Sequence, residues 1–171
     1  MADPMRPVPI LVALGSNLGD RQGHLGMAVR ELSAWSLSPP VVSSWYETAP
    51  MYELDQPAFL NGVVVLEAAP EPESILARLL ALEALALRVR TRRNGPRTLD
   101  CDLLAVGDCR IESPSLTLPH PRLQERPFVL CPLAEVAPGW LHPLLGLTAL
   151  SLWNQWLHEH HDEPRPRRVC C

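Results

Sequence analysis

Hydrophobic and polar positions along this chain fall into two patterns, which predict strands and helices in turn. The run from Val8 to Leu14 is almost continuously apolar, which is typical of a strand with both faces buried. After a polar Gly-Ser-Asn turn, Leu25, Val29 and Leu32 recur with the spacing of one helical face, and this helix should end near Trp35. A buried strand followed by an amphipathic helix indicates a helix packed on a sheet.

The next segments continue this order. Residues 41–47 and 62–68 are β-rich and are predicted to pair, and Pro72 then suits the first turn of a second helix. The apolar face of that helix is predicted to consist of Ile75, Leu76, Leu79, Leu80, Leu82, Leu85 and Ala86.

A further strand is predicted over 98–106, and a turn at Gly107 leads from it into a short strand at 109–112. The resulting order βαββαβ predicts an α/β (α+β) fold with a ferredoxin-like core. In that core an antiparallel sheet is flanked by helices in a three-layer αβα arrangement.

The C-terminal third adds two more predicted helices, at 127–136 and 147–160. A length of 171 residues with 47% hydrophobic residues suits one domain with a sizeable core. We therefore expect a single domain over 8–160. The arginine- and proline-rich end, 161–171, is expected to be a disordered tail.

Composition narrows the class of protein. A net charge of −4 argues against general nucleic-acid binding, and all fifteen basic residues are arginine, which excludes lysine Schiff-base chemistry and a Walker A loop. Five cysteines without a C-x-x-C pair suit a reducing compartment. Because no apolar run approaches membrane-spanning length and the first residues lack a signal-peptide core, we expect a cytoplasmic protein without a membrane partner.

Two segments carry candidate chemistry, and the first is the long connection at 48–61. It contains prolines and shows no periodicity. Long irregular loops in small domains are usually functional, so we interpret this one as a substrate loop.

The second segment is an arginine cluster followed by two aspartates. Its basic residues are Arg88, Arg90, Arg92, Arg93 and Arg97. Asp100 and Asp102 are two apart, which in a strand places both carboxylates on one face with their Cα atoms roughly 6.6 Å apart. Mg²⁺ takes carboxylate and phosphate oxygens, and guanidinium groups bind further phosphate oxygens two at a time. The pattern predicts a site for a polyphosphate and its metal ions.

Each part of this pattern also has a simpler explanation. A D-x-D sequence more often marks the solvent side of a half-buried strand, here with Leu99, Cys101 and Leu103 as its buried side. Five arginines can equally form a solvated loop. Because the whole chain is acidic, however, the basic density is local, and the two parts together favour a functional site.

Five motifs follow one another along the chain. They are Ala13-Leu-Gly-Ser-Asn-Leu-Gly19, Tyr46-Glu-Thr-Ala-Pro50, Asp55-Gln-Pro-Ala-Phe-Leu-Asn61, Asn94-Gly-Pro-Arg-Thr-Leu-Asp-Cys-Asp102 and Leu118-Pro-His-Pro-Arg-Leu-Gln-Glu-Arg126. Each is weak alone, but in this order they are specific. From about Ile10 to Pro143 the chain resembles the 6-hydroxymethyl-7,8-dihydropterin pyrophosphokinase family of folate biosynthesis.

The resemblance implies transfer of the β,γ-diphosphate of ATP, the co-substrate, to the hydroxymethyl oxygen of the pterin, with release of AMP and with two Mg²⁺ ions. A diphosphoryl group in transfer spreads negative charge over many oxygens, so positioning and cationic stabilisation should dominate catalysis. We expect ATP and the pterin as partners, without nucleic acid. The expected state is a monomer, with an oligomer left open.

The resemblance also implies roles for individual residues. The catalytic residues would be Arg88, Arg97, Asp100 and Asp102, of which Asp100 and Asp102 would hold the metal ions. Residues expected to bind ATP and its phosphates are Arg88, Arg90, Arg97, Leu103, Thr117, His120 and Arg126. Residues expected to bind the pterin are Thr48, Ala49, Met51, Phe59, Asn61, Asp100 and Phe128.

Three positions depart from the family pattern. Asn94 stands where many members have Trp, Leu87 replaces a common Gly, and Leu80 replaces a common Gln. A lid that excludes water usually needs a bulky residue over the nucleotide. These departures therefore concern loop closure and affinity more than the metal site.

Two other classes of function fit part of the sequence. A two-metal phosphohydrolase could use the same carboxylates with a water nucleophile, but it would not need the aromatic and amide residues Phe59, Asn61 and Phe128. A non-catalytic ferredoxin-like module could bind RNA or a regulator, but two carboxylates on its sheet would repel a nucleic-acid backbone.

Overall fold

The computed structural model describes residues 6–69, 71–87 and 93–170. Within these ranges the helices are α1 (Arg21–Trp35), α2 (Pro72–Leu85), η1 (a 3-10 helix, Leu123–Glu125), α3 (Pro127–Val136) and α4 (Ala149–Glu159). The strands are β1 (Val8–Ser16), β2 (Val41–Val42), β3 (Tyr46–Thr48), β4 (Phe59–Ala68), β5 (Asp100–Val106), β6 (Ile111–Glu112), β7 (Thr117–Leu118) and β8 (Arg167–Arg168). None of the helices in these ranges has the length and apolar character that crossing a membrane requires.

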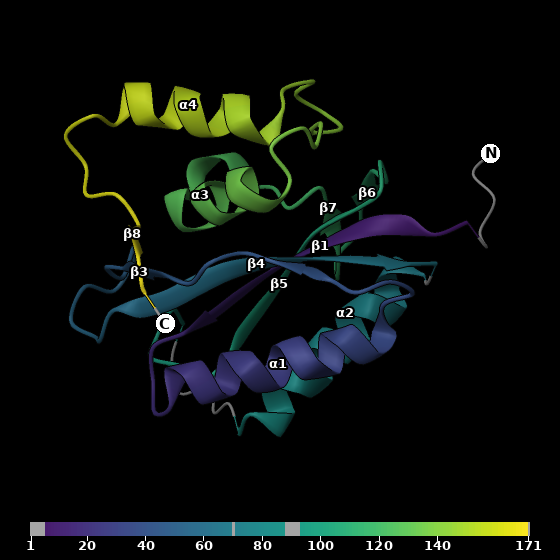
Figure 1. Cartoon of the computed structure of the whole chain (residues 1–171), viewed down its shortest axis with the longest axis horizontal. Coiled ribbons are helices and arrows are strands. Elements are labelled where there is room, and N and C mark those ends of the chain that lie inside the picture. Colours follow the sequence, from purple (N-terminus) through teal and green to yellow (C-terminus); the bar gives the residue numbers. More distant parts are fainter. Residues whose placement is uncertain (1–5, 70, 88–92, 171) are drawn as a thin grey trace.

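Strand β1 lies between β4 and β5 in a six-stranded sheet. It pairs antiparallel with β4 on one side and with β5 on the other, in the order β5-β1-β4-β3-β8, and β2 also pairs with β4. Helices α1 and α2 cover one face of the sheet; α3 covers the other face, and α4 packs on the outer side of α3 (Figure 1). The predicted ferredoxin-like βαββαβ core with three layers is confirmed.

The continuous apolar run of β1 is divided between two hydrophobic cores. Ile10, Val12 and Leu14 belong to the core shared with α1 and α2, whereas Leu11 and Ala13 belong to the core shared with α3 and α4. Full burial of one such leucine or isoleucine contributes about 1.5–3 kcal/mol. Helices on both faces thus explain why this strand shows no polar alternation.

The β-rich run predicted at 41–47 forms two short strands, β2 and β3. Between them, the Ser43 hydroxyl accepts a hydrogen bond from the Val63 amide at 2.9 Å, in place of a strand carbonyl. Trp45 then packs against Gly62, where a Cβ would lie 2.6 Å from the indole ring. These two side chains interrupt the ladder, and neither contact is evident from local sequence.

The short strand predicted at 109–112 is present as β6, but it pairs with β7 in a separate two-stranded sheet. The chain then passes along β5, where the His120 amide donates to the Leu104 carbonyl at 2.8 Å. This detour places His120 beside β5.

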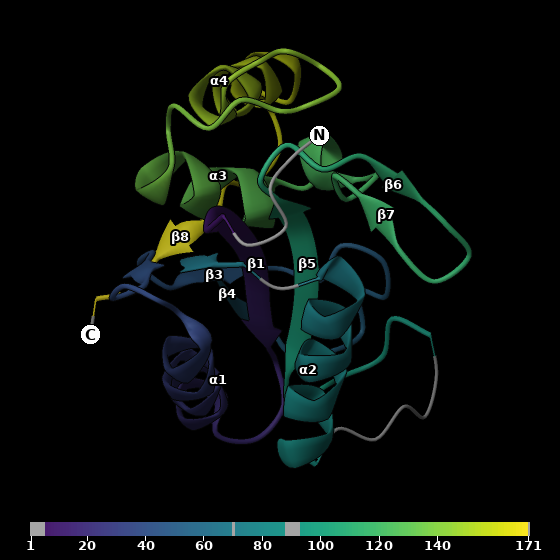
Figure 2. The same ribbon diagram turned by 90° about the vertical axis from the view of Figure 1, so that its right-hand side faces the viewer.

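The described part of 161–171, for which a disordered tail was expected, contains strand β8. Strand β8 pairs with β3 at the edge of the sheet opposite to β5 (Figure 2). In addition, the Val169 amide donates to the Trp45 carbonyl at 2.9 Å, and Arg167 Nη2 donates to Glu47 Oε1 at 2.6 Å. Composition indicated disorder because it does not reveal pairing with residues more than a hundred positions earlier in the chain.

Candidate active site

A pocket of about 350 Å³ lies where β4, β5 and the start of α3 meet. Ten predicted site residues line it: Thr48, Ala49, Met51, Phe59, Asn61, Arg97, Asp100, Asp102, Arg126 and Phe128. The other lining residues are Tyr52, Leu76, Leu80, Glu83, Asn94 and Cys101. The predicted site residues Arg88 and Arg90 fall outside the residues that the structure describes.

Three residues predicted to bind the nucleotide do not line this pocket. The Leu103 side chain is buried in the opposite core, beneath α1 and α2. Thr117 is exposed at the start of β7. His120 lies close enough to Arg126 and Asp100 for their charges to affect its pKa.

The two carboxylates lie on the face of β5 that looks toward α3, as their spacing predicts. The strand register places Asp100 beside Gly15 and Asp102 beside Ala13 on β1. Each carboxylate has an arginine partner: Arg97 Nε lies 3.7 Å from Asp100 Oδ2, and Arg126 Nη1 lies 3.0 Å from Asp102 Oδ2. Both carboxylates line the pocket.

The surroundings of Asp102 shift the pKa of its carboxyl group. Burial, and then repulsion by Asp100, raise its pKa to about 6, although Arg126 acts in the opposite direction. A site that disfavours two adjacent negative charges is relieved when a cation binds between them.

The donor set also fits Mg²⁺, which prefers oxygen and is often held by one or two carboxylates plus substrate phosphates. Within the described ranges, no group of three or more His, Cys, Asp or Glu side chains could hold a metal ion. Two carboxylates alone leave most of the coordination sphere of such an ion to water and substrate oxygens.

The two arginine partners are themselves largely buried. Their side chains are 17% and 14% exposed for Arg97 and Arg126, and in each case Nε finds no hydrogen-bond partner among the described residues. Their guanidinium groups lie over aromatic rings, 5.2 Å from the centroid of Phe59 and 5.7 Å from that of Phe128. Buried guanidinium groups with unused donors are suited to binding an anion.

The other predicted residues of the pocket are aromatic or uncharged. Phe59 begins β4, and Phe128 lies in the first turn of α3 behind Pro127, which suits a helix start. Asn61 is buried, and its Nδ2 donates to Thr48 Oγ1 at 2.7 Å. We refer to Thr48, Phe59, Asn61 and Phe128 as the aromatic half. Arg97, Asp100, Asp102 and Arg126 form the carboxylate half.

Gly15 on β1 joins the two halves. It pairs with Asn61 of β4 on one side and with Asp100 of β5 on the other. A Cβ at this position would lie 2.6 Å from Asn61 Oδ1, which is too close for any real contact. The glycine therefore gives the Asn61 amide the space it occupies at the base of the pocket.

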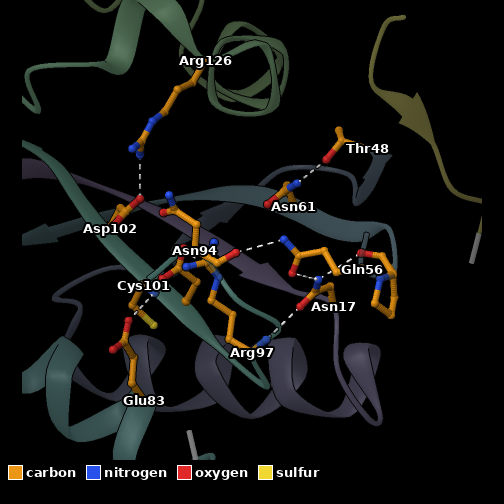
Figure 3. A network of polar contacts seen from close by, with 12 residues as sticks. Asn17, Thr48, Gln56, Asn61, Glu83, Asn94, Arg97, Cys101, Asp102 and Arg126 are labelled. Carbon is orange, nitrogen blue, oxygen red and sulfur yellow. Dashed lines mark hydrogen bonds and ion pairs between the residues drawn. The ribbon is translucent and has the colours of Figure 1, made fainter. Parts of the chain in front are cut away.

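Asn17 and Gln56 were not predicted to have a role, yet they tie together the loops around the site (Figure 3). Asn17 Oδ1 accepts from the Arg97 amide at 2.8 Å, and its Nδ2 donates to Gln56 Oε1 at 3.0 Å and to the Pro57 carbonyl at 2.9 Å. Gln56 Nε2 in turn donates to the Asn94 carbonyl at 2.9 Å. Both residues lie in the quoted motifs, which was the only available signal.

Glu83 was also missed. It is a buried carboxylate on α2, and its Oε1 accepts from the Cys101 amide at 3.0 Å, between Asp100 and Asp102 (Figure 3). Its charge contributes to the raised pKa of Asp102. A single glutamate within an amphipathic helix normally belongs to the solvent face, so sequence periodicity gave no reason to select it.

His120 is held as a neutral ring. Burial, followed by the charges of Arg126 and Arg122, lowers its pKa to about 4. Its Nδ1 accepts a hydrogen bond from the Arg122 amide at 3.2 Å, so the proton of the neutral imidazole belongs on Nε2. The residue can therefore donate one hydrogen bond without carrying charge.

Comparison with known proteins agrees with this geometry. The family model of 7,8-dihydro-6-hydroxymethylpterin-pyrophosphokinase (HPPK) matches residues 11–138. A 2-amino-4-hydroxy-6-hydroxymethyldihydropteridine pyrophosphokinase of Synechocystis is 42% identical over 146 residues, covering 85% of this chain and 74% of that protein. The protein of the same name from Pseudomonas aeruginosa is 41% identical and covers 75% of this chain and 80% of that protein.

Some longer proteins match as well. The folic acid synthesis protein fol1 of Pneumocystis carinii is 37% identical; the match covers 91% of this chain but 21% of that protein. The wild-type HPPK-DHPS structure of Plasmodium falciparum with STZ-DHP has a TM-score of 0.74 at 14% identity and covers 99% of this chain and 48% of that chain. The match to fol1 is thus confined to about a fifth of that protein, and the Plasmodium likeness, which concerns the fold alone, to about half. With its site geometry and these matches, the chain belongs to the 7,8-dihydro-6-hydroxymethylpterin-pyrophosphokinase (HPPK) family.

Proposed function

We propose that the chain transfers the β,γ-diphosphate of ATP to the hydroxymethyl oxygen of 6-hydroxymethyl-7,8-dihydropterin in folate biosynthesis, giving AMP and the pterin diphosphate. The observation that carries this function is the presence of two unlike surfaces in one pocket of about 350 Å³. A flat heterocycle suits the aromatic half, and a polyphosphate with its cations suits the carboxylate half.

The aromatic half would hold the pterin. Phe59 and Phe128 offer rings against which a flat heterocycle can stack. Because Asn61 Nδ2 already donates to Thr48, the Asn61 Oδ1 is the amide atom suited to accept from an N–H group at the edge of the pterin. Ala49 and Met51, which also line the pocket, would limit the size of the bound ring system.

The carboxylate half would hold two Mg²⁺ ions through Asp100 and Asp102. The chemistry that these ions supply is neutralisation of phosphate charge and a lower pKa of the attacking alcohol. The protein contributes the fixed orientation of the two carboxylates on β5. It also keeps them partly buried, which strengthens their attraction for a cation.

Arg97 and Arg126 would bind phosphate oxygens. The Nε–H group of each has no hydrogen-bond partner among the described residues, and an anion in the pocket would supply one. In the transition state the transferring group is highly charged, so cationic groups held rigidly in place lower its energy. The stacking of each guanidinium over Phe59 or Phe128 limits its movement.

The remaining predicted nucleotide contacts are proposed with narrower roles. His120 would donate from its neutral Nε2–H to a phosphate oxygen. Leu103 could contact the nucleotide through its backbone, since its side chain lies in the opposite core. Thr117, Arg88 and Arg90 are proposed on the family resemblance alone.

The alternatives explain less of the pocket. A two-metal phosphohydrolase would need the carboxylates but not the buried Asn61–Thr48 pair beside two phenylalanines. A nucleic-acid module would place negative charge against a phosphate backbone without a compensating basic face, since the chain has a net charge of −4. We further propose that the protein acts as a monomer in the cytoplasm, where its dispersed cysteines would remain reduced.

Incubation with ATP, Mg²⁺ and 6-hydroxymethyl-7,8-dihydropterin tests this function directly. We expect AMP and the pterin diphosphate in equal amounts, and no AMP when the pterin is left out or when Mg²⁺ is removed by chelation. Formation of ADP or orthophosphate would identify a different transfer, and release of phosphate without the pterin would favour the phosphohydrolase.

A further inference from the structure

The short strand β3 carries part of the aromatic half. Pairing with β4 alone would hold β3 only weakly. The strand has three residues, Tyr46–Thr48, and pairs with β4 over those three positions. The chain leaves regular structure directly after Thr48 and enters the loop that contains Ala49 and Met51. A strand of this length at a sheet edge needs further contacts to keep its position.

The C-terminal segment supplies those contacts. Strand β8 pairs with the free edge of β3, opposite Tyr46 and Glu47, and the Val169 amide adds a hydrogen bond to the Trp45 carbonyl. Both carboxylate oxygens of Glu47 are engaged. Oε1 accepts from Arg167 at 2.6 Å, and Oε2 accepts from both Nη atoms of Arg21 at 3.2 Å.

The ion-pair chain continues toward the pocket. Arg21, the first residue of α1, also donates from Nη1 to the Ala58 carbonyl at 2.9 Å, directly before Phe59. On β3 itself, Thr48 follows Glu47 and holds the Asn61 amide. Glu47 therefore connects the C-terminal segment to two residues of the aromatic half.

A second cavity lies behind the aromatic half, with a volume of about 230 Å³. The C-terminal residues Pro164 and Pro166 line one side of it, and Thr48, Met51 and Phe128 line the other. These last three residues also line the main pocket. The C-terminal segment thus lies behind residues that would touch the pterin.

We propose, on the basis of the function proposed above, that residues 163–170 are a positioning element for pterin binding. Arg167 and the β8 ladder hold Glu47 and β3 in place, and through them Thr48 and Asn61 keep the orientation that recognises the pterin edge. The carboxylate half is held by β5 at the opposite edge of the sheet. Loss of the C-terminal contacts should therefore weaken pterin binding selectively.

The side-chain contact is tested by Arg167→Ala in the full chain. The Arg167 side chain is 74% exposed, and exposed ion pairs contribute little, so we expect the KM for the pterin to rise about threefold. The KM for ATP and kcat should stay within about twofold of wild type. Arg167→Lys restores a cation and should recover most of the loss. Arg30→Ala removes an exposed arginine of α1 outside residues 163–170; it is the control and should leave the pterin KM unchanged.

The backbone contact is tested by Val169→Pro, which removes the amide that donates to Trp45. Val169→Ala keeps this amide and controls for the lost side chain. We expect the dissociation constant of the pterin, measured by its fluorescence without ATP, to rise about tenfold for the proline variant and less than threefold for the alanine variant.

The outcomes separate this inference from the function itself. If wild type forms no AMP, the proposed function fails. If wild type is active and Arg167→Ala and Val169→Pro bind the pterin as tightly as it does, the C-terminal segment has no positioning role. Equal losses in pterin affinity, ATP affinity and kcat would show a general loss of structure and would likewise overturn the inference.

Discussion

The two halves of the pocket are built in different ways. The carboxylate half draws Arg97, Asp100 and Asp102 from one short stretch of chain, and adds Arg126 from the start of α3. The aromatic half is assembled from three elements: the pairing of β3 with β4 brings Thr48 to Asn61, and α3 adds Phe128. Most groups that would bind phosphate and metal thus come from one strand and the loop before it, whereas those that would recognise the pterin depend on strand pairing.

The largest effect should follow from Asp102→Asn, which removes a charge from the carboxylate half alone. We expect kcat/KM to fall by about 10³-fold or more, because the variant loses charge stabilisation in the transition state. The pterin dissociation constant, measured by fluorescence, should stay within about threefold of wild type.

The stability of the same variant sharpens this contrast. Asp102 is repelled by Asp100 and attracted by Arg126, so the free energy of unfolding at pH 7 should change by less than about 1 kcal/mol. Urea denaturation measures this value. Near-normal activity in Asp102→Asn would remove the carboxylate half from catalysis, and loss of pterin binding would show that the two halves are not separable.

Gly15→Ala should affect both halves, because this residue lies between them. Its Cβ would meet Asn61 Oδ1 at 2.6 Å, so the amide or the strand must shift. We expect the free energy of unfolding to fall by about 1–3 kcal/mol and the pterin KM to rise about tenfold. Steady-state kinetics and urea denaturation test the two effects.

Gly139→Ala provides the matched control. A Cβ at Gly139 would meet nothing within 4 Å, so this variant should behave like wild type in both measurements. If Gly15→Ala is equally silent, the close approach of Asn61 to β1 does not constrain the pocket.

The smallest effect concerns the pH dependence of stability. It should arise from His120, which lies near Arg126. The pKa of His120 is lowered from 6.5 to about 4, so between these values the unfolded chain binds a proton that the folded protein does not. Stability should therefore fall as the pH drops from about 6.5 to 4. Allowing for the remaining exposure of the ring, we expect this contribution to be about 1–2 kcal/mol.

Asp102 acts in the opposite direction over the same range, because its pKa is raised and the folded protein takes up the proton first. The useful measurement is therefore the difference between wild type and His120→Asn in urea denaturation at pH 7, 5.5 and 4. Wild type should lose more stability than the variant. Parallel curves would mean that His120 is not held neutral by burial and by Arg126 and Arg122.

Much of the fold and of the two halves of the pocket could be predicted from the sequence. The D-x-D spacing predicted two carboxylates on one strand face, and the apolar runs predicted the layers, because both depend on local periodicity. The family resemblance predicted the aromatic half. Ten of the predicted site residues do line one pocket, although their roles remain proposals.

Features that depend on distant contacts were missed. The pairing of Arg167 with Glu47 spans 120 residues, and the Asn17–Gln56 hydrogen bond spans 39. Glu83 was overlooked for a different reason, since its partner is a backbone amide and not a side chain of recognisable type. Sequence periodicity reports which face of an element is buried, but it does not report which loop or strand meets that face.

Because Gly15 lies between Asn61 and Asp100, the strand spacing of the sheet fixes the distance between these two residues. Neighbouring strands lie about 4.8 Å apart, so two strand spacings set roughly 10 Å between the backbones that carry the amide and the carboxylate. That span is fixed by hydrogen bonds across three strands and not by any flexible loop. In a bound substrate, the distance from the ring to the phosphate groups must match this span. The sheet itself could therefore select a substrate with a short one-carbon arm between ring and phosphate.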